Sequence, residues 1–330
     1  MHASGFEKTR PLLLLFLAVL TLMGFAIVSP SILSGANFAS MAVFGVEVGI
    51  IAFGQTLVIC GGNTGIDLSV GATMALSQVI LGLILEHGFA WPVAIIGALV
   101  AGIILGGINA LAICRFRISA IIATLATLFA YNGLALVLTN GTNIDLTKSS
   151  QLFLGIGQST IFGFPFQLII IYLPILIIFA YVQHGSSFGR ALYLTGTNDR
   201  AAWLAGIRVS YIRGLTYAAA GLTAAIAAVI NAARLGTAQP DAGDQANLIS
   251  IAIVVLGGTA IFGGTGSVIG TAMATVVIAI VDYGLSYNNF NPIFQAGVIG
   301  VALIAVILIE NPIVNLREYV RNTRTKSNNR

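Results

Sequence analysis

Long apolar stretches recur along the whole chain, and they constrain its fold more than any other feature of the sequence. A helix that crosses about 30 Å of hydrocarbon needs roughly 17 to 25 mostly apolar residues. Only helices and closed barrels satisfy their backbone polar groups in lipid, and these stretches are continuous rather than alternating, which favours helices. Charged residues make up 8% of the chain, against about 25% in a soluble domain. The sequence therefore predicts an all-α polytopic membrane protein, with one transmembrane domain over residues 1–330.

Ten apolar runs are expected to cross the membrane. In chain order they cover residues 11–28, 38–60, 68–85, 92–114, 118–138, 166–183, 214–233, 248–262, 267–285 and 293–309. The first run follows Lys8 and Arg10, and no small-x-small cleavage site comes closely after it. We therefore expect an uncleaved helix there rather than a signal peptide.

The positive charges divide unevenly between the two sides of this arrangement. If the N-terminus is cytoplasmic and the crossings alternate, 13 of the 15 Lys and Arg residues fall inside, and only Lys148 and Arg234 fall outside. Lys and Arg accumulate in cytoplasmic loops, so this tally favours ten crossings with both termini in the cytoplasm. It predicts outer loops at 139–165 and 236–247 and a large cytoplasmic loop at 184–213.

The cytoplasmic loop contains a short helix candidate, NDRAAWLAGI at 198–207, with Asn198 or Asp199 as its N-cap. Such a helix could dock into a cleft on a soluble protein. It could equally lie on the membrane surface as an amphipathic helix anchored by Trp203. The residues alone favour neither interpretation.

Four stretches resemble one family of membrane proteins. RALYLTGTNDRAAWLAGI at 190–207 is similar to the cytoplasmic coupling segment of ABC-importer permeases, in which an Ala-Ala-x-x-x-Gly core inserts into the ATPase. GIDLSVGATMAL at 65–76, NAARLGTAQPDAG at 231–243 and IAIVVLGGTAIFGGTGSVIGTAMA at 251–274 resemble the branch with the ribose, galactose, xylose, arabinose and autoinducer-2 permeases. The four stretches occur in the same order as in that family. The resemblance assigns contact with the ATPase to Asn198, Asp199, Arg200, Ala201, Ala202, Trp203 and Gly206.

The resemblance implies a bacterial inner-membrane permease that is not itself an enzyme. Its partners would be a second permease copy or a sister permease, an ATPase chain that often has two fused cassettes and holds ATP and Mg, and a periplasmic substrate-binding protein. The solute would be a sugar or a similar neutral polar molecule, moved by alternating access. Autoinducer-2, a nucleoside or a branched-chain amino acid are the alternatives within the family. No nucleic-acid partner is expected, and the basic residues 317–330 are expected to lie against lipid head groups.

The stretch CGGNTGIDLSVG at 60–71 places polar residues between two apolar runs. Its glycines allow the second helix to stop there, and Asp67 or Ser69 could cap the third helix. A broken helix at membrane depth is tolerated only where it is buried in protein or lines a watery cavity, and a carboxylate there costs about 2.5 to 3.5 kcal/mol on insertion scales. We therefore expect both a cap and a wall of the translocation path. The path residues predicted here are Asn63, Thr64, Gly65, Asp67 and Ser69, of which Asn63 and Thr64 are an insertion relative to the resembled permeases.

A second glycine-rich stretch, LGGTAIFGGTGSVIGTAMA, occupies residues 256–274. Small residues allow helices in membranes to approach closely, so packing is favoured over solute contact. The residues expected to pack in this way are Gly257, Gly258, Gly263, Gly264 and Gly266. The Gly-Lys-Ser/Thr ending of a phosphate-binding loop is missing, so we expect no nucleotide cofactor in this chain.

Few ionisable residues lie inside the apolar runs. Glu47 and Asp282 could form a proton relay in an ion-coupled secondary transporter, which is the alternative from another class. A structural ion pair, with Arg234 as a possible partner, is favoured instead. Asn109 is expected to form hydrogen bonds between helices. Cys60 and Cys114 suggest neither a disulfide nor a metal site.

Overall fold

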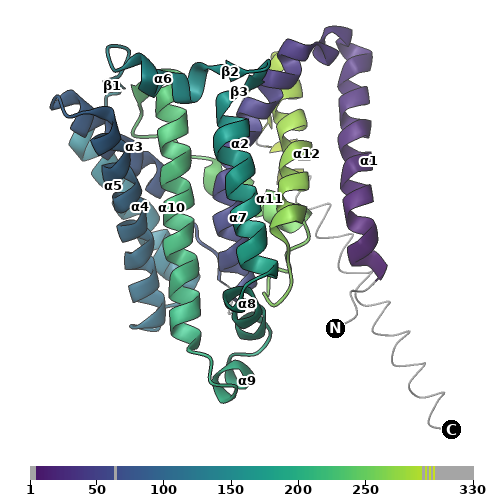
Figure 1. Cartoon of the computed structure of the whole chain (residues 1–330), viewed down its shortest axis with the longest axis vertical. Helices are drawn as coiled ribbons and strands as arrows, with labels where there is room; N and C mark the ends of the chain where they lie inside the picture. Colours follow the sequence, from purple (N-terminus) through teal and green to yellow (C-terminus); the bar gives the residue numbers. More distant parts are fainter. Residues whose placement is uncertain (1–4, 63–64, 292–293, 296, 299, 302–330) are drawn as a thin grey trace.

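The protein is a bundle of long helices that share a roughly common direction (Figure 1). The computed structural model describes residues 5–62, 65–291, 294–295, 297–298 and 300–301. The short helix α6 (Gln151–Gln158) and the small strands lie at one end of the bundle, and the short helix α9 (Asp199–Leu204) lies at the other (Figure 1). We refer to these as the α6 end and the α9 end.

The remaining helical elements complete the bundle. They are α1 (Gly5–Val28), η1 (Pro30–Leu33), α2 (Gly35–Cys60), α3 (Val70–Glu86), α4 (Trp91–Cys114), α5 (Ala120–Thr139), η2 (Leu168–Tyr172), α7 (Leu173–His184), α8 (Ser187–Thr197), α10 (Val209–Leu235), α11 (Ala246–Leu256) and α12 (Val268–Tyr287). Strand β1 (Ile144–Asp145) pairs antiparallel with β4 (Thr237–Ala238), and β2 (Thr160–Ile161) pairs antiparallel with β3 (Phe164–Pro165). The first pair joins the two predicted outer loops to each other.

Among the described residues, six helices are long and apolar enough to cross a membrane: α1, α2, α4, α5, α10 and α12. The π-helical segment η2 continues into α7, and these together with α8 form a seventh candidate that is bent by 64°. The chain is therefore a multi-pass, all-α membrane protein. The tenth predicted run, 293–309, lies almost wholly outside the described residues.

One predicted crossing is wrong in its extent. The run 248–262 was expected to be a transmembrane helix, but α11 ends at Leu256 after 11 residues, a length of about 16 Å. Gly257 and Gly258 follow, and Gly258 has φ +98°, a conformation that stops a helix. Residues 257–267 then form an irregular loop. Helix α3, with 17 residues, is also shorter than the six long helices.

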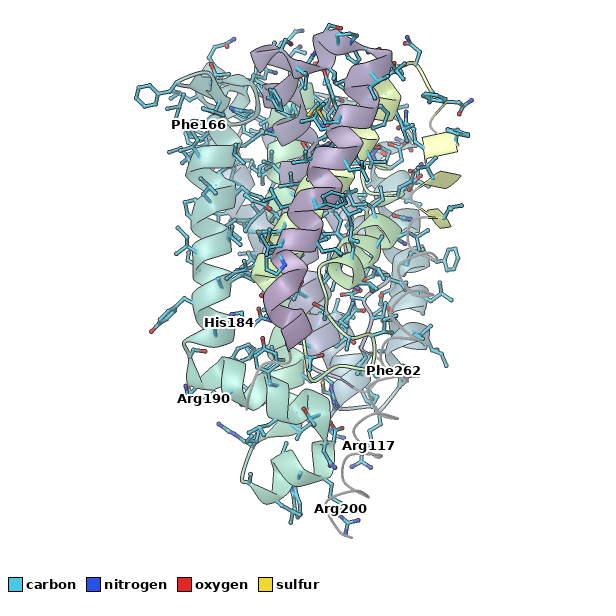
Figure 2. The ribbon with its side chains drawn as sticks, turned by 90° about the vertical axis from the view of Figure 1, so that its right-hand side faces the viewer. Arg117, Phe166, His184, Arg190, Arg200 and Phe262 are labelled. Atoms are coloured by element: carbon cyan, nitrogen blue, oxygen red, sulfur yellow. The ribbon has the colours of Figure 1, made fainter. Side chains whose placement is uncertain are left out.

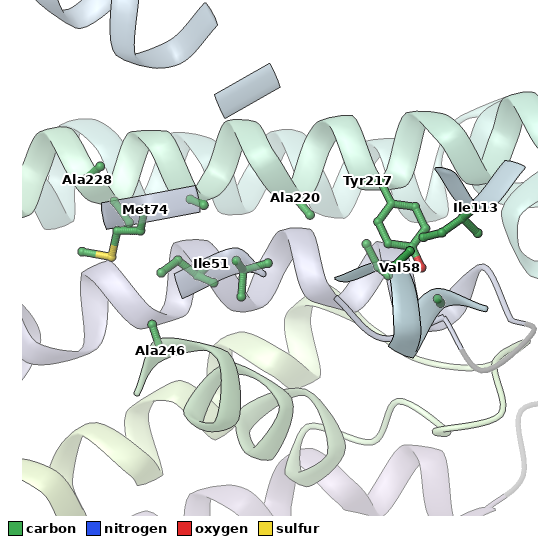
Figure 3. Packing of buried hydrophobic residues seen from close by; sticks show 13 residues of the cluster. Ile51, Val58, Met74, Ile113, Tyr217, Ala220, Ala228 and Ala246 are labelled. Atoms are coloured by element: carbon green, nitrogen blue, oxygen red, sulfur yellow. The ribbon is translucent and has the colours of Figure 1, made fainter. Parts of the chain in front are cut away.

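The core lies between α2 and α10, where small side chains allow close approach (Figure 3). Ala220 and Ala228 of α10 are fully buried against the face of α2 that carries Ile51 and Val58. Helix α10 also contacts the backbone of α4, because Gly102 meets Gly221. Packing of this kind is how helices associate in lipid, where burial of apolar surface provides little driving force. Tyr217, which is also fully buried, completes the cluster near the α9 end.

Candidate functional site

The segment between α2 and α3 is a turn buried within the bundle. Helix α2 ends at Cys60, and Gly62 follows with φ +74°, a value that residues with a side chain rarely adopt. Gly65 is buried, and its N–H donates to the carbonyl of Gly62. The predicted break in the helix is therefore present. Asn63 and Thr64, the two inserted residues, lie outside the described residues.

Asp67 anchors this turn to two neighbouring helices. Its side chain is 2% exposed, and Oδ1 accepts hydrogen bonds from the N–H and the hydroxyl of Ser69, at 2.8 and 2.7 Å. Ser69 Oγ in turn accepts from Nδ2 of Asn109 on α4, and Asn109 Oδ1 accepts from Thr127 on α5, both at 2.7 Å. The expectation that Asn109 bonds between helices is confirmed. This chain of bonds holds the turn against α4 and α5.

The predicted helix cap is wrong in detail. Ser69 occupies the N-cap position of α3, but its side chain makes no capping bond, because the hydroxyl is already engaged by Asp67 and Asn109. Asp67 bonds to the N–H of Ser69, one residue before the helix. Gly65, Asp67 and Ser69 are buried in this chain, and their role in a translocation path stays a prediction.

Helix α9 presents two large apolar side chains to the outside. The side chain of Asn198 accepts a hydrogen bond from the N–H of Ala201 and caps the helix, as predicted. Ala202 is buried and fixes one side of the helix, whereas Trp203 and Leu204 are 68% and 71% exposed. Figure 2 shows Arg190 and Arg200 at this same end, together with Arg117 and Phe262. Gly206 ends the segment with φ +82°.

Arg213 on α10 connects α9 to the end of α2. Its guanidinium donates to Asp199 Oδ1 at 2.8 Å and to the carbonyl of Gly61 at 3.2 Å. The side chain of Arg213 is 9% exposed and that of Asp199 is 48% exposed, so the arginine is held inside the bundle while its partner lies at the surface. These bonds connect the first residue of α9 to Gly61, the residue that follows the end of α2.

The two glycine-rich segments and α8 meet at the backbone. The N–H of Gly264 donates to the carbonyl of Cys60 at 3.1 Å. A Cβ added at Gly62 would lie 2.7 Å from Cα of Gly196, and one at Gly263 would overlap the backbone of Gly62. Gly263 thus packs against the turn at Gly62, Gly264 packs against Thr197 at the end of α8, and Gly257 packs on α12 at Gly270. The remaining two glycines predicted to pack, Gly258 and Gly266, lie in the same loop with positive φ.

A second polar network lies near the α6 end. Arg234 donates to both carboxylate oxygens of Glu47, at 2.7 and 3.2 Å, so the structural ion pair is confirmed. Asn231 donates to Glu47 Oε2 and accepts from Gln78, whose Oε1 accepts from the N–H of Gln239 beyond β4. The network thus joins α2, α3 and α10 to one of the predicted outer loops.

Sequence reasoning missed several of these contacts. In the sequence, Arg213 serves only as one of the cytoplasmic positive charges. The opposite charge of Asp199, 14 residues earlier, was the one sequence feature that could have indicated an ion pair. Gln183 of α7 accepts from the N–H of Val268, and Tyr193 of α8 donates to the carbonyl of Gly266. Nothing in the sequence pairs these residues.

The sequence matches, over residues 37–307, the family described as the permease component of branched-chain amino acid transport systems. The match covers most of the chain. The chain therefore belongs to this family of membrane permeases. No solved structure matches it significantly.

Curated relatives carry more particular names. The chain is 36% identical over 311 residues to the ribose import permease protein RbsC of Bacillus subtilis (strain 168). The aligned region covers 94% of this chain and 95% of the relative. It is 34% identical over 264 residues to RbsC of Escherichia coli (strain K12), covering 79% of this chain and 81% of the relative. The autoinducer 2 import system permease protein LsrD of Enterobacter sp. (strain 638) is 33% identical over 321 residues, with 95% and 96% coverage.

Proposed function

We propose that the chain is the transmembrane permease subunit of an ATP-binding-cassette importer, and that it carries a sugar or a similar neutral polar solute. The observation that carries this proposal is similarity over nearly the whole length to ribose and autoinducer-2 import permeases. The solute is assigned less directly, because the two kinds of relative carry different molecules. Ribose is the first candidate and autoinducer-2 the second.

The orientation follows from the distribution of charge. Arg117, Arg190 and Arg200 lie at the α9 end (Figure 2), whereas Lys148 and Arg234 belong to the loop and helix terminus near the α6 end. Because positive charge accumulates on the cytoplasmic side, the α9 end faces the cytoplasm and the α6 end the periplasm, in the inner membrane of a bacterium. Helices α3 and α11 complete their crossings with the irregular segments next to them, which brings the crossings among the described residues to nine, and the run 293–309 would be the tenth.

The exposed face of α9 provides the contact with a partner ATPase. Trp203 and Leu204 are apolar, adjacent and exposed, and large buried apolar side chains contribute most of the energy of protein interfaces. ATP and Mg would be bound by that partner. A periplasmic binding protein would deliver the solute to the α6 end, and a second permease would complete the path.

Transmission from α9 into the membrane uses contacts within this chain. Asp199, Arg213 and Gly61 connect α9 to the end of α2, and Gly196 of α8 touches both glycine-rich segments. When the ATPase closes and moves α9, these contacts shift the two segments together. Alternating access then follows from a displacement of the irregular segments, which have no continuous helix to bend.

The ion-coupled alternative is less well supported. Glu47 would have to exchange protons with the path, but both of its carboxylate oxygens are bonded, to Arg234 and Asn231. These bonds give the carboxylate a structural role between α2 and α10.

Uptake of labelled ribose and of labelled autoinducer-2 by cells with and without the chain tests the proposal. We expect uptake of one solute to disappear on deletion and to return with the wild-type chain. This uptake should persist with a protonophore while ATP is maintained, and stop when ATP is depleted. Uptake that stops with the protonophore at constant ATP would establish ion coupling and overturn the proposal.

A further inference from the structure

A hollow of about 400 Å³ opens between α4 and α10 near the α9 end. The two helices are in backbone contact at Gly106 and Tyr217, but the contact loosens beyond that point. A Cβ added at Gly107 would meet no atom within 4 Å, and one at Gly214 would meet only Ala110, at 3.7 Å. The absence of side chains at these two glycines therefore creates the space.

The walls of the hollow are continuous with an apolar surface. On α4, Ile104, Ile108 and Leu111 are exposed, and on α10 Leu215 is exposed. A helix of a membrane protein that presents such side chains along its outer surface faces lipid chains or another membrane-embedded chain. The floor of the hollow, formed by Gly107, Ala110 and Leu111, therefore offers an apolar groove at the edge of the bilayer.

The mouth of the hollow is cationic. Arg115 lines it directly, and the guanidinium of Arg208 lies 5.2 Å from the ring centroid of Tyr211, which also lines it. Ser210 and Tyr211 add hydroxyl groups that can donate hydrogen bonds. Among the described residues that line the hollow, none is acidic. Arginine forms paired hydrogen bonds with phosphate, and tyrosine is enriched at the boundary between membrane and water.

We propose that this hollow binds an anionic phospholipid, with the phosphate between Arg115 and Arg208 and an acyl chain along Gly107 and Ala110. An apolar groove that ends in cations matches a molecule with a negative head and an apolar tail. Basic pockets between transmembrane helices on the cytoplasmic side bind such head groups. A second copy of the chain fits less well, because its exposed surface would have to supply negative charge to this mouth. The site is built from residues of α4 and α10 and those next to them, and it does not depend on which solute is carried.

Native mass spectrometry of the purified full-length chain tests the site, with phosphatidylglycerol titrated against phosphatidylcholine. The variant Arg115→Gln/Arg208→Gln removes the cations, and Gly107→Leu adds a side chain to the groove at a position where a Cβ meets no atom within 4 Å. We expect the first variant to bind phosphatidylglycerol about 10- to 30-fold more weakly than wild type. Gly107→Leu should also lower the bound fraction of phosphatidylglycerol. Inorganic phosphate should not displace the lipid, because it lacks the acyl chain.

Matched controls separate the site from general attraction. Arg190→Gln/Arg200→Gln removes two exposed arginines from the same end of the molecule, and Gly133→Leu fills an equally open glycine on α5. Both control variants should retain the wild-type preference for phosphatidylglycerol over phosphatidylcholine. Any lipid bound by residues 317–330 is common to the wild type and all variants, so it does not affect the comparison. The proposal is overturned if the arginine variant keeps the wild-type preference, or if phosphate displaces the lipid. It is also overturned if Gly107→Leu changes the oligomeric state and leaves lipid binding intact, because the hollow would then be a contact between copies.

Discussion

Arg213 connects parts of the chain that lie far apart in the sequence. It bonds to Asp199 at the start of α9 and to Gly61 at the end of α2, a separation of 152 residues for the second bond. Both bonds are donated by one guanidinium nitrogen, Nη2, whose place in the planar group fixes their directions, whereas the donors of a lysine ammonium rotate freely. Because Asp199 is about half exposed, the ion pair itself contributes little to stability. We expect the contact to matter for transmission of movement rather than for stability.

Replacement of Arg213 should therefore uncouple ATP hydrolysis from transport. We expect Arg213→Ala to lower the solute imported per ATP hydrolysed by about tenfold, within the range of typical coupling free energies, while the ATPase still copurifies. Arg213→Lys should be intermediate, and Arg190→Ala, an exposed arginine on α8, should match the wild type. Proteoliposomes with the partner proteins provide the measurement. If Arg213→Ala imports as much solute per ATP hydrolysed as the wild type, the contact from Asp199 through Arg213 to Gly61 does not transmit the movement.

Among the elements, the end of α2, the end of α8 and the 257–267 loop meet in a closely packed contact near the α9 end. These segments meet through backbone atoms, which leaves no room for side chains at Gly62, Gly196 or Gly263. Interiors packed this closely move as a unit between discrete arrangements rather than deforming continuously. We therefore expect α8, the turn after α2 and the 257–267 loop to move together.

Two glycines with similar backbone conformations allow the cost of steric contact to be distinguished from the cost of a positive φ. Gly62 has φ +74° and abuts Gly196, whereas Gly88, after α3, has φ +82° and nothing within 4 Å. We expect Gly88→Ala to lower the free energy of unfolding by about 1–2 kcal/mol, the cost of a left-handed conformation. Gly62→Ala should lower it by a further 1–3 kcal/mol or so, because the backbone of Gly196 must move. Unfolding midpoints in detergent measure both, and equal losses would show that the contact is not tight.

Hydropathy predicted most of the elements, because crossing a membrane imposes a length and a composition on each helix. The N-cap at Asn198 and the end of α2 at Cys60 also follow from local chemistry. The end of α11 at Leu256 was missed because the apolar run continues past Gly257 and Gly258. The contact between Cys60 and Gly264 could not be predicted, because glycines specify where a backbone can approach but not which segment approaches it.

The whole molecule is proposed to have one orientation in the membrane, with the α9 end in the cytoplasm. Leu152 on α6 and Arg200 on α9 are both exposed and lie at opposite ends. Leu152 should face the periplasm and Arg200 the cytoplasm. Cysteines at these two positions report the side directly, because Cys60 is buried and only Cys114 has to be replaced.

Labelling with a membrane-impermeant maleimide should therefore differ between the two positions. In a Cys114→Ser background and right-side-out vesicles, Leu152→Cys should react at once, and Arg200→Cys only after the membrane is permeabilised. Reaction of both cysteines before permeabilisation would indicate leaky vesicles. Leakage is excluded if cytoplasmic marker proteins in the same vesicles remain unlabelled. The reverse pattern would invert the orientation and place α9 outside, where no ATPase could reach it.

Copurification from native membranes shows whether the exposed face of α9 binds a cassette ATPase, as proposed. Wild type should retain an ATPase, identified by mass spectrometry and by ATP hydrolysis. Trp203→Glu/Leu204→Glu should lose it, because both side chains are exposed and their replacement leaves the fold intact. Leu152→Glu, at the opposite end and equally exposed, should retain it. An ATPase that stays bound to the α9 variant as firmly as to wild type would contradict the account.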